Sequence, residues 1–418
     1  AERTDGMGYD CVVIGGGAAG LMAAALLGRA ASGGRRVLLL EKAPRPGKKL
    51  LATGNGTCNL TNTGATAARY HGCPSLAAAV LGAFSPADTM AFFTSLGVDC
   101  RVRDEGRVYP YSEQAAAVLD ALRLETAARG IETRCDQPAT ALQRTKSGWR
   151  VVTAAGTIET NTVLVCTGGA AAPALGGSAE AYGLLTDLGL TKTPLFPSIV
   201  QLRTDTTLVR AVKGIRVDAG VELRLDGAVQ ARNTGEVLFT DYGLSGPAVM
   251  QISRLAGDWE RRQRGRLTAV LDLLPDWELS ALEERIGARS RLTGRTLEDL
   301  FTGLLHKRVG QTVLRAAGVL PLTRPADTLT PAECRRAAAL CKGWELPVLG
   351  TKGFGGAQVT AGGIDARQVD PQTMGLRGFP GLYAAGEVLD VDGDCGGFNL
   401  QFAFSSAYVA AAAIAADW

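Results

Sequence analysis

Short runs of consecutive apolar residues dominate the first part of the chain. The runs at residues 9–14 (YDCVVI), 36–40 (RVLLL) and 162–166 (TVLVC) predict strands that are buried on both faces. A glycine-rich turn and a helical stretch from about Gly17 to Arg29 lie between the first two runs. A strand, a turn, a helix and a second strand in this order form a βαβ unit, so the pattern predicts a parallel sheet covered by helices.

Residues typical of helix ends predict two further helices before residue 130. Ser85 is a good N-cap, Pro86 follows it at the first helical position, and Gly97 is a good stop. By the same reasoning Ser112 caps a helix that runs toward Arg129. Both helices are therefore expected to begin and end at local signals.

The pattern changes character near residue 194. Alternating, strand-like runs follow, for example at residues 199–202, 221–225 and 237–240, and helical periodicity takes over from about residue 278 to residue 341. From about residue 350 the sequence is again rich in glycine and apolar residues, as in the first part of the chain. We therefore expect a discontinuous α/β domain of residues 1–195 and 350–418, a β-rich insert of residues 196–275 and a helical subdomain of residues 276–349.

The composition is that of an ordinary globular protein. Apolar residues make up 46% of the 418 residues and charged residues 20%, which excludes a disordered chain. The 44 Lys and Arg against 41 Asp and Glu give a net charge of +3, too small to imply binding to nucleic acid or to a membrane surface. No run approaches the roughly 20 apolar residues that span a bilayer. We therefore expect a cytoplasmic protein that takes a small-molecule substrate, inserts into no membrane and binds no nucleic acid; its oligomeric state stays open.

One arginine-rich stretch, residues 254–266 (RLAGDWERRQRGR), has two interpretations. It could be a nucleic-acid patch. Acidic residues interleave with the arginines, and this favours a solvated surface instead.

Metal and thiol chemistry are poorly supported. The nine cysteines form no CxxC pair, and the chain has only two histidines, which argues against a zinc site. Three alternating aspartates from Asp390 to Asp394 resemble the opening of a calcium loop. Cys395 and Gln401, however, stand where that loop needs its Gly and its bidentate Glu. We expect no metal and reduced, packed thiols.

The strongest chemical signal is the segment Gly15-Gly16-Gly17-Ala18-Ala19-Gly20, which follows the first predicted strand and opens the first helix. The first glycine of this fingerprint permits a tight turn, the second lets the backbone approach a pyrophosphate, and the third lets the helix pack close to the sheet. The N-terminus of the helix then offers unpaired N–H groups and a positive dipole end to the phosphates. Glu41, at the end of the next strand, is placed to accept hydrogen bonds from a ribose. The spacing predicts dinucleotide binding.

A second glycine-rich segment near the C-terminus decides between FAD and NAD(P) as the resident cofactor. Gly386 and Glu387 follow a short predicted strand, and a helix begins near Asn399. The N–H groups of Leu400 and Gln401 would face the flavin pyrimidine edge, where a positive helix end stabilises negative charge on reduced flavin. Alone, this segment could equally be a loop before a core helix. Together with the N-terminal fingerprint it favours FAD.

Motifs from residue 7 to residue 410 together resemble the HI0933/YhiN-type flavoprotein family. They are, in order, MGYDCVVIGGGAAGLMAA, GKKLLATGNGTCNLTN, GRVYPYS, TPLFPSIVQL, GEVLFTDYGLSGPAV, AQVTAGGI and GLYAAGEVLDVDGDCGGFNLQFAFSSAYVAA. The resemblance implies an α/β fold: a Rossmann-like FAD-binding domain of the glutathione-reductase type, interrupted by an insert with a β-barrel and a helical subdomain.

The resemblance also implies the cofactor-binding residues. At the adenosine and pyrophosphate end they are Gly15, Gly17, Gly20, Glu41 and Lys42. Along the flavin they are Lys49, Thr53, Gly54, Asn55, Gly56 and Asn59. The site is completed by Thr167, Gly168, Gly386, Glu387, Gly397, Asn399, Leu400 and Gln401. The chain departs from the family at Thr57, where an Arg is common, and this removes a cation near the flavin or the substrate.

Family members include NAD(P)H-dependent reductases of conjugated bile-acid enones and proteins described as aminoacetone oxidases. The resemblance therefore implies an FAD-dependent oxidoreductase that uses NAD(P)H as a transient co-substrate to reduce an activated C=C bond in an apolar, steroid-like enone. A flavin oxidase of a small amine is the first alternative. The second alternative is a non-catalytic, flavin-bearing binding or sensor protein that associates with RNA through the arginine-rich stretch.

Reduction of an enone needs a proton donor and a contact for the carbonyl oxygen. Tyr109, Tyr111 and Tyr242 are candidate donors, and Arg107 is a candidate carbonyl contact. Each tyrosine could instead be an amphipathic residue at the edge of the core. Cys58 is expected to be a packed, neutral thiol, since it has no CxxC partner.

Overall fold

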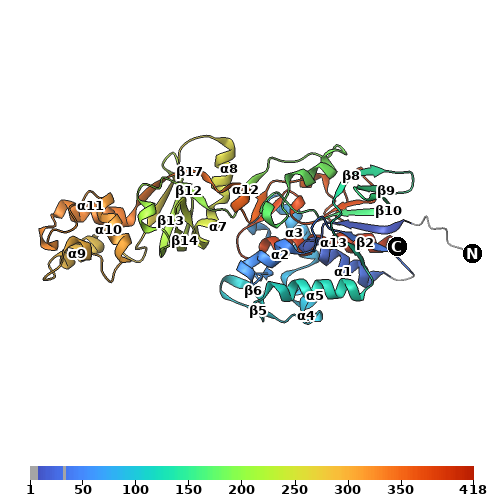
Figure 1. Ribbon diagram of the computed structural model, residues 1–418, viewed down its shortest axis with the longest axis horizontal. Coiled ribbons are helices and arrows are strands. Elements are labelled where there is room, and N and C mark those ends of the chain that lie inside the picture. Colours follow the sequence, from blue (N-terminus) through green and yellow to red (C-terminus); the bar gives the residue numbers. More distant parts are fainter. Residues whose placement is uncertain (1–7, 32–33) are drawn as a thin grey trace, which may run out of the picture. The chain divides into compact units, whose positions relative to one another are not determined.

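A computed structural model describes residues 8–31 and 34–418, and these divide into two compact units (Figure 1). The first unit contains the chain up to Phe196 together with Gln358–Trp418, and the second is Pro197–Ala357. The helical part of the insert was expected to reach residue 349. Its last helix ends at Lys342, because Trp344–Thr351 is a strand that pairs inside the barrel of the second unit.

The core of the first unit is a seven-stranded mixed sheet in the order β7-β2-β1-β10-β9-β8, with β19 also paired to β10. β1, β2, β7, β10 and β19 run parallel, and β9 and β8 form the antiparallel edge. The bounds are β1 (Tyr9–Ile14), β2 (Val37–Leu40), β7 (Glu132–Arg134), β8 (Ala139–Arg144), β9 (Trp149–Thr153), β10 (Gly156–Val165) and β19 (Leu382–Ala384). The predicted parallel pairing is present, and the central strands β1 and β2 are buried along almost their whole length, as their apolar runs predict.

Two buried helices pack side by side in the first unit: α1 (Ala18–Ala30) and α13 (Phe398–Ala416) (Figure 1). The 19 residues of α13 are long and apolar enough to cross a membrane, but 67% of its apolar window is buried inside the protein. Burial against α1 accounts for its composition. The other helices of this unit are α2 (Lys48–Ala52), α3 (Pro74–Ala83), α4 (Pro86–Ser95), α5 (Ala115–Ala128) and α6 (Gly183–Thr186).

The two predicted helix starts have different outcomes. Ser85 caps α4 as expected, because its hydroxyl accepts from the Asp88 N–H while the Asp88 carboxylate accepts from the Ser85 N–H. The cap at Ser112 is wrong. Helix α5 begins after Gln114, whose side chain makes no capping bond, and Glu113 before it has a φ of 53°. The positive φ turns the chain between Ser112 and the helix, so the hydroxyl is not at the N-cap position.

Two small sheets join distant segments of the first unit. One contains β3 (Thr61–Asn62), β5 (Cys100–Val102) and β6 (Arg107–Pro110), with β6 in the centre. The other pairs β4 (Tyr70–Gly72) with β20 (Val391–Gly393). β18 (Val359–Ala361) also belongs to this unit.

The second unit contains a closed barrel in the order β12-β15-β14-β13-β16-β17. Its strands are β12 (Leu202–Thr204), β13 (Arg216–Leu225), β14 (Ala228–Phe239), β15 (Gly243–Ser245), β16 (Leu267–Asp272) and β17 (Trp344–Thr351). The short helices α7 (Pro247–Ile252) and α8 (Arg254–Arg262) follow β15. The strand predicted at residues 199–202 is wrong except for its last residue. Ile199 has a φ of 51°, which ends β11 (Phe196–Ser198) and separates it from β12.

Three helices inserted between β16 and β17 complete the second unit: α9 (Leu279–Ser290), α10 (Lys307–Ala316) and α11 (Pro331–Lys342). We call residues 279–342 the helical module. Thr330 and Glu333 form the capping box that starts α11. The short helix α12 (Gly353–Gly356) follows β17.

Candidate flavin site

The predicted cofactor motifs follow four parallel strands of one sheet. Gly15 follows β1, Glu41 follows β2, Thr167 lies just after β10, and Gly386 lies just after β19. Parallel strands present their carboxyl ends at one edge, and ligands of open α/β sheets bind outside that edge. Backbone bonds tie the loops together there: Gly15 N donates to Leu40 O (2.8 Å) and Ala385 N donates to Val165 O (3.0 Å). The two glycine-rich segments, far apart in sequence, therefore meet.

The turn at Gly15–Gly20 has the close approaches that the fingerprint predicts. Gly15 has a φ of +104°, and a Cβ there would lie 2.3 Å from Cys166 O. A Cβ on Gly20 would lie 1.8 Å from Gly15 O, so only glycine lets α1 begin here. A Cβ on Gly17 would meet nothing within 4 Å, and Gly17 caps α1 without a side-chain bond. The N-terminus of α1 is thus open to an anion.

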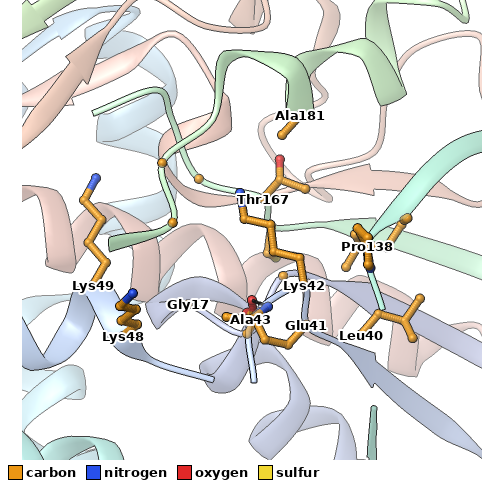
Figure 2. A pocket seen from close by; sticks show the side chains of 18 of the residues that line it. Gly17, Leu40, Glu41, Lys42, Ala43, Lys48, Lys49, Pro138, Thr167 and Ala181 are labelled. Atoms are coloured by element: carbon orange, nitrogen blue, oxygen red, sulfur yellow. Dashed lines mark hydrogen bonds between the residues drawn. The ribbon is translucent and has the colours of Figure 1, made fainter. Parts of the chain in front are cut away.

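A hollow of about 870 Å³, open to solvent, lies over this turn (Figure 2). Seven of the predicted cofactor residues line it: Gly15, Gly17, Glu41, Lys42, Lys49, Thr167 and Gly168. Figure 2 shows Lys42 reaching from the end of β2 across the hollow in the direction of Thr167. Segments 137–139 and 175–177, which the motifs do not predict, also line the hollow. Neither carries a chemical motif, so no local signal could have identified them.

Glu41 holds the walls of the hollow in place. One carboxylate oxygen accepts from Gly16 N and the other from Ala43 N, both at 2.7 Å. A carboxylate oxygen can accept more than one hydrogen bond, so both oxygens retain capacity for a ribose hydroxyl. The side chain therefore supports the turn and still fits its predicted role.

Lys49 and Glu387 connect the two halves of the site. Lys49 Nζ lies 2.8 Å from one oxygen of Glu387, and Thr360 N donates to the other oxygen at 2.9 Å. Both side chains of the ion pair are partly exposed. Ala19 in the first turn of α1 approaches Gly386, since a Cβ on that glycine would lie 2.9 Å from the Ala19 Cβ. The contacts bring four predicted residues together across more than 300 positions of sequence.

The loop predicted to line the flavin is strained. Between Thr53 and Asn59, the residues with positive φ are Gly54, Asn55, Gly56 and Cys58. Thr57, where the family often has Arg, donates its hydroxyl to Gly54 O at 2.6 Å and so helps to hold the loop. Burial raises the pKa of the Cys58 thiol to about 11, so this sulfur is neutral at ordinary pH, as the sequence predicts.

The N-terminus of α13 packs against the flavin loop. Gly397 has a φ of +96°, and a Cβ there would lie 2.4 Å from Thr61 O and 2.8 Å from Asn59 Oδ1. Asn399 accepts from Gly393 N and donates to Gly393 O, both at 2.8 Å, and so folds the loop that precedes the helix. Leu400, in the first turn, keeps the position expected for an exposed N–H donor.

Gln401 is predicted to offer its backbone N–H to the flavin. Its backbone N–H donates to Gly397 O at 3.1 Å, as the fourth residue of a helix must. Its buried side chain accepts from the Thr61 hydroxyl and donates to Phe84 O and Ser405 Oγ. Gln401 therefore holds the first turn of α13 in place and offers no free N–H to a cofactor.

Two buried polar atoms in this region have no hydrogen-bond partner among the described residues: Asn59 Oδ1 and Thr167 Oγ1. Buried polar atoms are nearly always satisfied by protein, water or a ligand. Both belong to residues that the sequence assigns to the cofactor. The residues present thus fit an elongated polar cofactor that reaches from the α1 turn to the 53–59 loop.

The four candidate catalytic residues separate into three groups. Arg107 and Tyr109 alternate with Val108 on β6 and share one face. A Cβ added to Gly54 would lie 3.7 Å from the Tyr109 ring, and a Cβ added to Gly396 would lie 3.6 Å from Arg107 Nε. Both side chains therefore border the flavin loops. Arg107 also pairs with the Glu105 carboxylate at 2.6 Å.

The other two tyrosines lie elsewhere. Tyr111 is 64% exposed, and the Arg101 guanidinium lies 4.1 Å above its ring. Tyr242 belongs to the second unit, where Lys352 Nζ lies 4.6 Å from its ring centre. The structure therefore brings Arg107 and Tyr109, and not Tyr111, to the flavin loops.

The aspartates that resemble a calcium loop have protein partners. Asp394 pairs with His71 Nε2 at 2.9 Å and with Arg69 at 3.2 Å. In the described part of the chain, no three His, Cys, Asp or Glu side chains are grouped as metal ligands would be.

Comparisons with known proteins agree with this geometry. The family model described as HI0933-like protein Rossmann domain matches residues 9–413. The chain is 36% identical over 407 residues to the 3-dehydro-bile acid delta(4,6)-reductase of Clostridium scindens, covering 96% of this chain and 98% of the relative. It is 30% identical over 415 residues to the ribosomal RNA dihydrouridine synthase of Escherichia coli, covering 96% and 97%.

Among solved structures, a flavocytochrome c3 fumarate reductase in its open conformation aligns with a TM-score of 0.52 and 17% identity. The alignment covers 98% of this chain and 78% of that one, and it supports the fold alone. The predicted Rossmann-like domain with an inserted barrel is confirmed. The chain belongs to the HI0933-like family, and it is an FAD-dependent oxidoreductase.

Proposed function

We propose that the protein is an NAD(P)H-dependent reductase of a C=C bond conjugated to a carbonyl, and that its substrate is a small apolar enone. The observation that carries this proposal is the 36% identity to a bile-acid enone reductase, which extends over 98% of the length of that relative. The position of Arg107 and Tyr109 beside the flavin loops supports it.

When bound, FAD supplies the hydride-transfer chemistry, and the protein supplies position and proton management. The fingerprint turn and Lys42 would hold the phosphates, Glu41 the ribose, and Lys49 would line the flavin. Arg107 would hold the carbonyl oxygen of the enone, where negative charge develops. Tyr109 would donate the proton to the α-carbon as the hydride reaches the β-carbon.

Anaerobic stopped-flow absorbance tests this function. The flavin is reduced with NADH or NADPH and then mixed with a panel of enones that includes bile-acid dienones. We expect reoxidation of the flavin at a rate that saturates with enone concentration, and a product with two more hydrogens. A reduced flavin that is indifferent to every enone would refute the substrate class. A flavin that neither nucleotide reduces would refute the electron donor.

The second candidate is reduction of uracil in ribosomal RNA. Its support is the 30% identity to a ribosomal RNA dihydrouridine synthase over 97% of that protein. The reaction class is the same, since the C5=C6 bond of uracil is conjugated to a carbonyl. The test is to incubate reduced enzyme with unmodified ribosomal RNA and to measure dihydrouridine by mass spectrometry of nucleosides. Formation of dihydrouridine, together with inert enones, would replace the first candidate by the second.

The remaining expectations from sequence predict different products. An oxidase of a small amine would oxidise aminoacetone in air and reduce O2 to hydrogen peroxide. A flavin-bearing sensor would show no turnover with any donor and acceptor pair.

A further inference from the structure

Positive charge is concentrated in the helical module. Residues 279–342 contain 11 Lys and Arg against 6 Asp and Glu, a net charge of +5. The rest of the chain contains 33 Lys and Arg against 35 Asp and Glu, a net charge of −2. The chain's small net charge therefore conceals one basic part.

Four arginines gather around the second half of α9 and the turn that follows it. We call Arg285, Arg289, Arg291 and Arg295 the arginine cluster. Burial, and then the nearby guanidinium groups of Arg285 and Arg295, lower the pKa of Arg289. The ion pairs found within residues 8–31 and 34–418 give none of the four a carboxylate partner. Like charges one helical turn apart destabilise a helix, so Arg285 and Arg289 lower the stability of α9.

Helix capping explains only half of the cluster. Arg289 donates to the carbonyl oxygens of Leu300 and Thr302, and Arg291 donates to Gly287 O at 3.2 Å. Cations near the C-terminus of a helix are favourable, so these two arginines have an internal role. Arg285 and Arg295 are exposed, and within the described chain neither makes a side-chain hydrogen bond or an ion pair.

The arginines of the stretch at residues 254–266 differ from those of the arginine cluster. On α8, Arg261 and Arg262 both pair with Asp258, at 2.7 and 2.9 Å. On β12, Arg203 lies 3.7 Å from Glu260. These arginines are neutralised within the second unit, whereas those of the arginine cluster have no carboxylate partner among the described residues.

We propose that the arginine cluster of the helical module is a docking surface for the phosphate backbone of RNA. Guanidinium groups match phosphate in a planar, bidentate geometry, and all four members are arginines. A polyanion would neutralise several of them at once and release its own counterions. The inference rests on the second candidate function for its meaning, and it replaces the expectation that the protein binds no nucleic acid.

The test is binding of a labelled stem–loop RNA to the FAD-loaded, full-length protein by fluorescence anisotropy over a range of salt concentrations. The variant R285Q/R291Q/R295Q removes three positive charges and leaves the hydrogen bonds from Arg289 to Leu300 O and Thr302 O intact. The matched variant R203Q/R261Q/R262Q removes three arginines that have carboxylate partners. We expect the first variant to bind RNA at least about tenfold more weakly and to lose roughly two to three units of slope in the plot of log affinity against log salt. The matched variant is expected to bind like the wild type.

Each outcome bears on the surface. Equal weakening by both variants would show a nonspecific charge effect, and absence of RNA binding by the wild type would refute the proposal. Anionic phospholipid vesicles are a parallel probe: binding to vesicles and not to RNA would also refute it. Melting temperature and flavin content establish that each variant is folded. If RNA binds through the cluster and no dihydrouridine forms, the surface stands and the second candidate reaction fails.

Discussion

Substitution of Gly20 by Ala tests the close packing on which the cofactor site depends. A Cβ at this position would lie 1.8 Å from Gly15 O and 3.0 Å from Gly15 C. Real contacts of this kind do not fall below 3.0 Å, so α1 and the turn must separate by roughly 1.2 Å. The obstructing atom is backbone, and no side chain can move aside to relieve it.

The expected cost follows from the surroundings of α1. The helix is buried along most of its length between the sheet and α13, so it cannot retreat freely. Overpacking of this kind costs about 1–3 kcal/mol. For a domain of this size that corresponds to a fall of about 2–6 °C in the melting temperature. The displaced helix N-terminus should also bind FAD more weakly.

The matched control is Gly17→Ala in the same turn. Gly17 has a φ of −81°, and its Cβ would meet nothing within 4 Å, so the fold should tolerate the methyl group with a loss below about 1 kcal/mol. The methyl group would stand where the pyrophosphate approaches, so FAD affinity should fall by about tenfold or more. Melting temperature of the apoprotein and flavin content by absorbance give the two readouts. Wild-type stability of G20A, or wild-type FAD affinity of G17A, would refute the reasoning.

Three further predictions concern the rest of the site. Lys49→Met removes the partner of Glu387 and a cation predicted to line the flavin, so we expect about tenfold weaker FAD binding in titrations, with Lys49→Arg restoring most of it. Equal binding by both variants would contradict the role. Tyr109→Phe is expected to lower kcat for enone reduction about 100-fold with KM little changed, while Tyr111→Phe, at an exposed position, should have no effect. Equal activity of the two variants would exclude a tyrosine proton donor on β6. Because burial raises the pKa of Cys58 to about 11, only roughly one thiol in a thousand is ionised at pH 8. Iodoacetamide should therefore leave Cys58 unlabelled in the folded protein while it labels the half-buried Cys73. Peptide mass spectrometry that finds the reverse would show that the Cys58 thiol is reactive.

The sequence determined those features that depend on a few neighbouring residues. Apolar runs located β1 and β2, the capping box located α4, and the spacing of Gly15, Gly17 and Gly20 located the dinucleotide turn. Each of these signals acts within about one helical turn or one strand. The position of the motifs after parallel strands then placed them at one edge of the sheet, because that consequence of topology holds for any such sheet.

Only the tertiary structure decided how individual side chains are used. Tyr109 and Tyr111 share a spacing of two, yet β6 ends at Pro110 and only Tyr109 stays beside the flavin loops. The Gln401 side chain fixes the first turn of α13 because its amide hydrogen-bonds to Thr61 and Phe84, which are far away in sequence. On α8, Arg261 and Arg262 pair with Asp258, whereas the arginine cluster pairs with no carboxylate in the part of the chain that the structure describes. Partners of this kind come from distant segments, and the energy of a buried amide or an unpaired charge depends on which groups the fold brings near.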